Sequence, residues 1–385
     1  MKIIVISNNI KSLINFRGDL LKELVKEGFD VLACSPKGSS KDNSIIFEHK
    51  LKDIGINHKS FKLQTRSTNI WDNLISLFSL FDIVKNYEPD LILPYTIKPI
   101  IFSGLITIYF RLFRKKNIKY LPMITGLGFI FEEYEFSFKS TFFKKTIRLF
   151  LSKILLFANG IIFQNEYDKK NLLKKKIIKI NTKTIRIYGS GVNLESYKNN
   201  ALPDEHVFLM ASRLIKEKGV IDYVNAASIV KKKYPNTKFL LAGSIESKGN
   251  YIPKEDLNYW ICKKTIKYLG NLQNLEKAFK EVRYAVLPTY YNEGMPRFLL
   301  EAMSCGKPII STFNHGCTDI VTNEINGFLT NFKDYYMIAH YMERLINMSQ
   351  KEIEVISHRN REKAEKLFDV NSINSQIINF IKEIK

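Results

Sequence analysis

The chain has 385 residues and a formal net charge of +21, with 45% apolar and 12% aromatic residues. This length suits two domains of ordinary size, and the apolar content excludes a disordered chain. Residues 1–190 hold 32 Lys and Arg against 16 Asp and Glu, so most of the excess charge belongs to the N-terminal half. A lysine-rich composition explains part of it, but the asymmetry indicates an acidic partner such as nucleic acid or an anionic membrane face.

Short β-branched runs alternate with helical stretches through the first half of the chain. We expect strands at 2–7, 30–35, 90–95, 119–124, 160–165 and 184–189. We expect helices at 16–28, 71–87 and 140–158. Apolar runs that alternate with amphipathic helices predict buried parallel strands in a doubly wound sheet.

Gly, Ser, Asn and Pro interrupt this alternation at 188–205, where we place the domain linker. The alternation then restarts, with expected strands at 206–212, 237–243, 285–290 and 307–312. The expected helices of this half are 219–234, 274–282, 297–304 and 371–385. The prediction is an α/β protein of two doubly wound, Rossmann-like domains, residues 1–190 and 191–370, with the helix 371–385 free to pack back on the first. We expect the two to face each other across a ligand-binding cleft.

Other sequence features limit the class of protein. The four cysteines have neither paired nor metal-like spacing and predict buried thiols of a reducing compartment: Cys34, Cys262, Cys305 and Cys317. The apolar start is too short for a signal peptide, and the longest apolar stretch, 99–110, is shorter than the roughly 20 residues of a spanning helix. The sequence has neither an Asp-x-Asp pair nor a His/Cys cluster. We therefore expect no bound metal ion, and we expect basic side chains to supply the positive charge instead.

The stretch "YNEGMPRFLLEAMSCGKPII" (291–310) predicts a binding site at a strand end. Pro296 fits the first position of a helix, and Gly306 fits its left-handed end. The amides of Gly294, Met295 and the first helical turn would then point out of the strand end, where a helix N-terminus attracts an anion or a polarised hydroxyl.

Two glutamates flank that turn, Glu293 at its rim and Glu301 within the helix. Carboxylates near an amide-lined anion site suit hydrogen bonds to sugar hydroxyls, one to a transferring sugar and the other to a ribose. The alternative is an exposed turn residue and a solvated helix face. Glu301 stands in "FLLEAM", where a carboxylate is costly unless it has a partner, so we favour the binding role.

A second stretch, "ASRLIKEKG" (211–219), follows the first strand of the second domain. Arg213 offers a fork that fits phosphate oxygens, and Lys218 supplies a compact positive charge. Together they would neutralise the pyrophosphate of a leaving nucleoside diphosphate.

These stretches, with "GSGVNLESY" (189–197), resemble the retaining nucleotide-sugar glycosyltransferases of the GT-B fold, family 4. The resemblance spans the second domain fully and the first more loosely. It is nearest to enzymes that build bacterial surface polysaccharides on a polyprenyl-diphosphate carrier. The resemblance implies that Arg213 and Lys218 hold the diphosphate, that Glu301 holds the ribose, and that Glu293 with Gly294, Met295 and Pro296 holds the donor sugar. Arg213, Lys218 and Glu293 would be the catalytic groups.

The implied reaction moves a hexose or N-acetylhexosamine from a UDP-sugar to a polyprenyl-diphosphate-linked saccharide in capsule, O-antigen or glycan biosynthesis. Attack from the front face retains the configuration, and the leaving phosphate takes the acceptor proton. Catalysis is then mainly electrostatic stabilisation and orientation, without a cofactor. Many family members carry a histidine near the donor sugar, where this chain has Thr125. The donor sugar, the acceptor saccharide, the linkage and the oligomeric state stay open.

The first domain is the expected acceptor-binding domain. The stretch "NNIKSLINFRGDLL" follows the first strand, and we expect its loop to lie over the cleft. Arg17 in this stretch and Lys98 after the strand at 90–95 are strand-end bases, so both are candidates to meet a carrier diphosphate. The alternative for each is an ordinary surface base. Thr125 and Gly126, in "TGLG", would allow close backbone approach to a sugar.

Residues 111–186 hold 18 Lys and Arg against 5 Asp and Glu, interleaved with Phe, Leu and Ile. This mixture is typical of a segment lying on anionic lipid, although amphipathic helices that only cover the sheet would also show it. The prediction is a cytoplasmic enzyme, peripheral on the inner face of the bacterial membrane.

The alternative functions are a UDP-sugar 2-epimerase on the same fold and a basic nucleic-acid-binding protein. The paired glutamates would repel the phosphate backbone of a nucleic acid.

Overall fold

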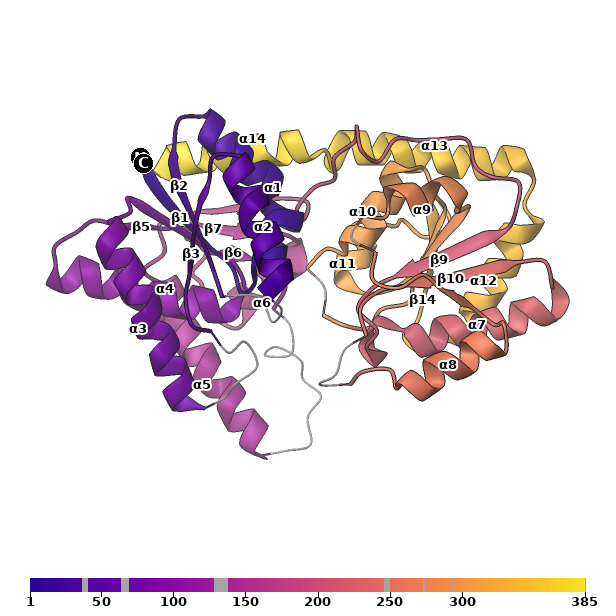
Figure 1. Cartoon of the computed structure of the whole chain (residues 1–385), viewed down its shortest axis with the longest axis horizontal. Helices are drawn as coiled ribbons and strands as arrows, with labels where there is room; N and C mark the ends of the chain where they lie inside the picture. Colours follow the sequence, from indigo (N-terminus) through magenta and orange to yellow (C-terminus); the bar gives the residue numbers. More distant parts are fainter. Residues whose placement is uncertain are drawn as a thin grey trace. The chain divides into compact units, whose positions relative to one another are not determined.

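The computed structural model describes residues 1–36, 41–63, 69–127, 138–245, 250–272, 274–292 and 294–384. The chain forms two compact units, and Figure 1 shows the first in indigo to magenta with the yellow C-terminal helix, and the second in pink to yellow. Unit 1 comprises Met1–Ser190 with Asn371–Lys385, and unit 2 comprises Gly191–Val370. The division lies where Gly and Ser interrupt the strand–helix alternation.

Unit 1 contains two parallel sheets. Its strands are β1 (Lys2–Ile6), β2 (Asp30–Ser35), β3 (Asn57–Ser60), β4 (Leu91–Pro94), β5 (Lys119–Tyr120), β6 (Met123–Ile124), β7 (Ile161–Phe163) and β8 (Thr184–Arg186). Its helices are α1 (Ile10–Lys26), α2 (Lys41–Asp53), α3 (Ile70–Tyr87), α4 (Ile97–Phe113), α5 (Phe138–Leu155), α6 (Glu166–Lys174) and α14 (Val370–Ile384). The orders are β3-β2-β1-β4-β5 and β6-β7-β8, and a parallel bridge from Tyr95 to Met123 joins the two sheets.

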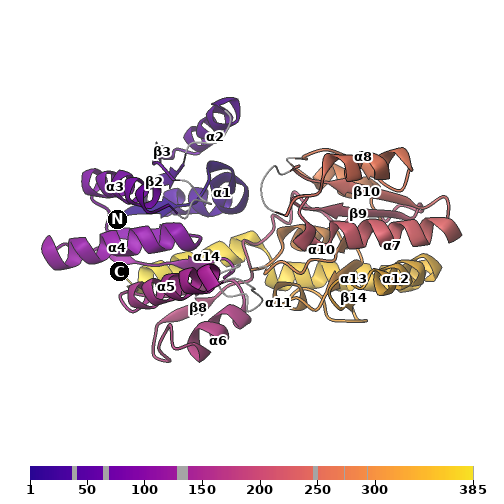
Figure 2. The same cartoon turned by 90° about the horizontal axis from the view of Figure 1, so that it is seen from below.

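Helices cover both faces of the larger sheet, because side chains alternate between the faces of a strand. Ile3 and Val5 of β1 pack in a core with α1, α2 and α14. Ile4 and Ile6 pack in a second core with α3 and α4. On that second face α4 packs between α3 and α5, as Figure 2 shows. The last helix, α14, therefore completes the core of the unit in which the chain begins.

Unit 2 is a single six-stranded parallel sheet with its helices. Its strands are β9 (Val207–Ala211), β10 (Lys238–Ala242), β11 (Lys267–Tyr268), β12 (Tyr284–Leu287), β13 (Ile309–Thr312) and β14 (Gly327–Thr330). Its helices are the 3-10 turn η2 (Lys216–Lys218), α7 (Val220–Lys233), α8 (Lys254–Cys262), α9 (Glu276–Glu281), α10 (Arg297–Ser304), α11 (His315–Thr318), α12 (Tyr335–Asn347) and α13 (Gln350–Leu367). The strand order β11-β10-β9-β12-β13-β14 changes direction between β9 and β12, the point where ligands of such sheets bind.

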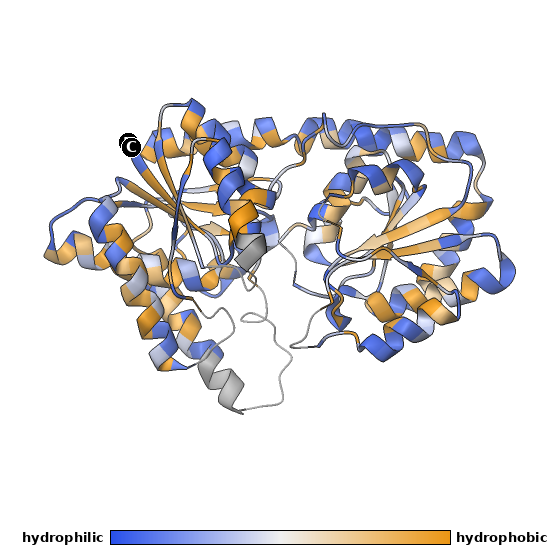
Figure 3. Cartoon of the chain, viewed as in Figure 1, coloured by the Kyte–Doolittle hydropathy of each residue, from blue (hydrophilic) through white to orange (hydrophobic). Residues whose placement is uncertain are grey.

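The central strands of both units are largely apolar, as Figure 3 shows by colour, whereas the edge strand β3 is polar. In unit 2 the central strands are held together by a run of aromatic rings. Phe208 of β9 stacks on Phe239 of β10 and on Tyr284 of β12, with ring centroids 5.5 and 4.5 Å apart. This buried run fixes the register of the strands whose carboxyl ends carry the candidate site.

The structure differs from the sequence-based expectation in several elements. The stretch at 99–110 lies in helix α4, which the sequence did not predict because it is apolar nearly all round. Residues 119–124 form two short strands separated by Leu121 and Pro122, because proline cannot donate to the ladder. The edge strand β3 has the polar sequence Asn-His-Lys-Ser and gave no strand signal. Cys262 is exposed, which corrects the prediction that all four thiols are buried.

Candidate functional site

The site in unit 2 is built from two loops at the carboxyl ends of neighbouring strands. β9 ends at Ala211 and β12 ends at Leu287, and the two strands pair directly. The carbonyl oxygen of Glu217, in the loop after β9, joins the two loops. It accepts hydrogen bonds from the backbone N–H groups of Tyr290 and Tyr291, both at 2.9 Å, and one from the Thr289 hydroxyl at 3.2 Å.

Gly219 allows this close approach. Its φ is +78°, in the left-handed region, and a Cβ there would lie 2.1 Å from the carbonyl oxygen of Pro288. Only glycine fits both conditions, so the loop that carries Arg213 and Lys218 reaches the second loop without strain. α7 begins directly after Gly219, as the sequence predicted.

Arg213 and Lys218 lie against one aromatic ring. The Arg213 Cζ is 5.5 Å and the Lys218 Nζ 5.2 Å from the centroid of the Tyr291 ring. Arg213 is exposed and Lys218 is half-buried. Burial, and secondly the charge of Arg213, lower the pKa of Lys218 to about 7. The structure therefore brings the two predicted cations together, and it adds Tyr291, which sequence reasoning missed.

The second loop continues into α10 (Arg297–Ser304), whose bounds match the prediction. Gly294, Met295 and Pro296 are buried just before the helix, and Pro296 is its N-cap, with no side-chain capping bond. Gly306 has a φ of +68° after the helix, as predicted. Glu293 lies outside the described residues, so its proposed role stays a prediction.

Glu301 is buried in α10, with 8% of its side chain exposed, so it is not a solvated helix residue. Its Oε1 accepts a hydrogen bond from the Arg297 Nε at 2.7 Å, one helical turn away. Burial raises the pKa of Glu301, while Arg297 and a hydrogen bond from Tyr197 oppose that shift. Sequence reasoning required a partner for this carboxylate but missed Arg297, which the i, i+4 spacing indicates.

The structure corrects the interpretation of Arg17. The segment after β1 is not a loop, because α1 begins at Ile10 and carries Arg17 in its third turn. Arg17 is only 4% exposed, so it is not a surface base either, and its Cζ lies 5.0 Å from the centroid of the Tyr95 ring. Arg17 therefore lies beneath the carboxyl end of β4.

Lys98 lies at that same strand end, in the first turn of α4. Its Nζ donates to the Asn73 Oδ1 of α3 at 3.0 Å. The side chain is half-buried, and burial lowers its pKa while Asp72 opposes the shift. Among the described side chains, the buried hydroxyls of Tyr95 and Thr96 have no hydrogen-bond partner. Polar groups thus gather at the start of α4.

Thr125 and Gly126 directly follow β6, and both are half-buried. The φ of Gly126 is +125°, which favours glycine. The last glycine of the "TGLG" turn, Gly128, lies outside the described residues. The two described residues lie at the carboxyl end of a strand that the Tyr95–Met123 bridge connects to the end of β4.

Within the described ranges, no group of three or more His, Cys, Asp and Glu side chains could hold a metal ion. None of the helices in those ranges has both the length and the apolarity to cross a bilayer.

Comparison with known proteins identifies the family. Residues 4–165 match the model of "Glycosyl transferase 4-like" proteins, and residues 193–364 match "Glycosyl transferases group 1". The fold and these matches define a glycosyltransferase. The chain belongs to the family 4, group 1 glycosyltransferases of the GT-B fold.

Individual relatives carry more specific names. The capsular polysaccharide biosynthesis glycosyltransferase CapM of Staphylococcus aureus is 28% identical over 249 residues, which are 61% of this chain and 63% of CapM. The N,N'-diacetylbacillosaminyl-diphospho-undecaprenol alpha-1,3-N-acetylgalactosaminyltransferase of Campylobacter jejuni is 25% identical over 349 residues, 87% of this chain and 86% of that protein. Anabaena HepE, solved with UDP-glucose, shares the fold with a TM-score of 0.77 at 18% identity, covering 100% of both chains.

We predict that Tyr291→Leu weakens UDP binding about tenfold, because the two cations lose the ring that holds them close together. Isothermal titration calorimetry with UDP measures this. Tyr291→Phe keeps the ring and should bind as wild type does. Tyr290→Leu is the matched control, since that ring faces Lys333 at 5.0 Å instead. Equal losses in the Leu and Phe variants of Tyr291 would contradict a role for the ring.

Lys218 should make UDP binding depend on pH near neutrality. With its pKa lowered to about 7, the free protein carries the Lys218 charge below pH 7 and loses it above. Binding of an anion requires that charge, so affinity relative to Lys218→Arg should fall by up to about tenfold for each pH unit above 7. Calorimetry with UDP from pH 6 to 9 tests this. The ratio of the wild-type affinity to the Lys218→Arg affinity at each pH cancels the effect of UDP's own titration. Parallel profiles for the two proteins would refute it.

Proposed function

We propose that the protein is a retaining glycosyltransferase that moves a hexose or N-acetylhexosamine from a UDP-sugar to a polyprenyl-diphosphate-linked saccharide. The observation that carries the donor half is the contact of Arg213 and Lys218 with one ring at the carboxyl end of β9. Two adjacent cations repel each other, and a diphosphate relieves that repulsion. HepE, which shares the fold, was solved with UDP-glucose, and this supports a UDP-sugar as donor.

The acceptor half is supported by the relatives. The Campylobacter protein is named for an undecaprenyl-diphosphate-linked acceptor, and CapM is named for capsular polysaccharide biosynthesis. In unit 1, Lys98 and the hydroxyls of Tyr95 and Thr96 lie around the start of α4. A helix N-terminus with a nearby lysine suits the diphosphate of such a carrier. Arg17, buried under Tyr95, would act through that ring, and Thr125 and Gly126 would face the acceptor sugar.

Every bond and proton that changes in the proposed reaction belongs to the UDP-sugar or to the acceptor. The bond between the sugar C1 and the UDP oxygen breaks, and a bond from the acceptor hydroxyl oxygen to C1 forms on the same face. The hydroxyl proton passes to the departing phosphate oxygen. Arg213 and Lys218 stabilise the charge on that phosphate, Glu301 holds the ribose, and Glu293 with the turn at 294–296 orients the sugar. No cofactor or metal enters this scheme.

The expected place of action is the cytoplasmic face of a bacterial membrane, where the polyprenyl acceptor is held in lipid. Residues 111–186 supply the bases that anionic lipid would attract. The family match supports a transferase over the epimerase and nucleic-acid alternatives.

The test is transfer from a panel of UDP-sugars to a short-chain polyprenyl-diphosphate saccharide, with NMR of the product anomeric centre. We expect turnover with one UDP-sugar and a retained configuration. Glu301→Gln should lower kcat/KM by about ten- to a hundredfold, because a charge-assisted hydrogen bond to the ribose is lost. Thermal denaturation should show an intact fold in the variant.

Glu365→Gln is the matched control. Glu365 pairs with the Arg361 Nε at 2.6 Å over the same i, i+4 spacing as Glu301 with Arg297, but it is exposed in α13. Its loss should leave transfer unchanged. Equal turnover in both Gln variants would remove Glu301 from the site, and inverted product configuration would overturn the retaining mechanism.

A further inference from the structure

Helix α3 of unit 1 exposes large apolar side chains on the face that points away from the core. Ile70, Trp71, Leu74, Ile75 and Phe78 are exposed, Trp71 to 70%. Their spacing of i, i+1, i+4, i+5 and i+8 places them on one helical face. The buried side of the same helix carries Ser76, Leu80 and Val84. A helix that covers a sheet normally shows polar residues outside, so this face is a candidate binding surface.

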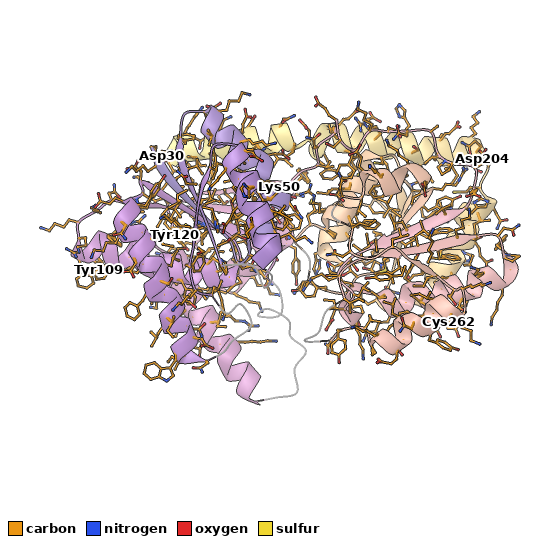
Figure 4. The ribbon with its side chains drawn as sticks, in the orientation of Figure 1. Asp30, Lys50, Tyr109, Tyr120, Asp204 and Cys262 are labelled. Carbon is orange, nitrogen blue, oxygen red and sulfur yellow. The ribbon has the colours of Figure 1, made fainter. Side chains whose placement is uncertain are left out.

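The apolar surface continues from α3 onto α4, which packs beside it. The Phe81 ring of α3 contacts Tyr109 of α4 with centroids 5.2 Å apart, and Tyr109 contacts Phe113 at 5.4 Å. Leu112 and Phe113 are exposed, Phe113 to 73%. Figure 4 shows Tyr109 at the outer margin of unit 1. We call this surface, from Ile70 along α3 to Phe113, the apolar strip.

The exposed charged side chains around the strip are mainly positive, although Asp82, four residues after Phe78, is exposed on the same face of α3. Arg114 and Lys115, directly after α4, are exposed. α5, on the other side of α4, exposes Lys145 and Lys153. The same helix also exposes Leu149 and Phe150. Apolar and aromatic side chains with interleaved bases are the composition of a surface that lies in the interface of an anionic bilayer.

We propose that the apolar strip inserts into an anionic lipid surface and anchors unit 1 there. This deepens the proposed function, because it names the helix face that meets the membrane holding the acceptor. A second copy of the chain is the competing occupant. A two-fold contact would set the strip against itself and bring its bordering bases together, which costs energy, whereas anionic head groups neutralise them.

The strip also sets the orientation of unit 1 on the lipid. α3 and α4 run in the same direction, because Asn73 meets Lys98 near their starts and Phe81 meets Tyr109 further along. Trp71 and Leu74 therefore lie at the end of α3 that is next to Lys98. When the whole strip lies on the lipid, this end of α3 and the neighbouring carboxyl end of β4, with its predicted acceptor-diphosphate groups, lie near the head-group level.

Trp71 provides a direct probe, since the chain has only two tryptophans, Trp71 and Trp260. In a Trp260→Phe background the emission comes from Trp71 alone. We expect a blue shift and protection from a water-soluble quencher with phosphatidylcholine–phosphatidylglycerol vesicles, and weaker changes with phosphatidylcholine alone. High salt should reduce but not abolish vesicle flotation, because the apolar contacts remain. Unchanged Trp71 emission with both kinds of vesicle would overturn the proposal.

A matched pair of substitutions tests the strip by flotation. Ile75 and Ile46 are both helical isoleucines of unit 1, exposed to 50% and 48%, but Ile46 lies in α2, outside the strip. Ile75→Ser should lower vesicle partitioning about tenfold, and Ile46→Ser should leave it unchanged. Equal losses in both proteins would contradict the strip. A dimer in solution that the strip variant abolishes, without vesicle binding by the wild type, would assign the surface to self-association.

The failure of this inference can be told apart from the failure of the proposed function. Vesicle binding is measured without UDP-sugar or acceptor. If the strip binds vesicles but the protein transfers sugar from no UDP-sugar, the lipid anchor stands and only the proposed UDP-sugar transferase activity is rejected. If the strip variant glycosylates a water-soluble short-chain acceptor at the wild-type rate while the wild type does not bind vesicles, only the lipid anchor falls.

Discussion

Two like charges are held together at one aromatic ring in unit 2, and the chemistry proposed for the protein depends on that arrangement. Arg213 and Lys218 both lie within 5.5 Å of the Tyr291 ring centroid. The negative face of the ring attracts each cation, but burial, and secondly the charge of Arg213, still lower the pKa of Lys218. Such a pair gains most from an anion with two charges. A departing nucleoside diphosphate is an anion of that kind.

The backbone makes this arrangement rigid. One carbonyl, that of Glu217, accepts bonds from the loop that carries Tyr291, and Gly219 permits the approach. The buried aromatic run through Phe208 fixes the strands from which both loops emerge. Electrostatic stabilisation is most effective when the charged groups need not reorganise, and the loop contacts provide that condition.

The sequence predicted much of this site, because its signals are local. The apolar face of 297–304 and the left-handed Gly306 define one short helix, and the structure confirms both. Pro296 was predicted as its first residue and is instead the N-cap, one position earlier. Sequence could not show that Tyr291 meets Arg213, since the two are far apart in the chain and only the pairing of β9 with β12 brings them together. Arg17 was misplaced for a related reason. The polar start of α1 resembles a loop, but Asn9 caps the helix there by accepting from the Ser12 N–H.

Unit 1 has surface features that composition alone could not show. The apolar stretch at 99–110 is mostly core, whereas α3, which the sequence predicted only as a helix covering the sheet, exposes one whole apolar face. Periodicity cannot distinguish these cases, because a helix with apolar residues on both sides looks buried from its sequence. The proposed lipid anchor rests on the bases of this unit together with the exposed apolar face of α3.

A structure of the protein with UDP tests the central claim most directly. The account predicts the diphosphate between Arg213 and Lys218 at the carboxyl end of β9, with the ribose hydroxyls at Glu301. Binding of UDP elsewhere on unit 2, or on unit 1, would contradict it.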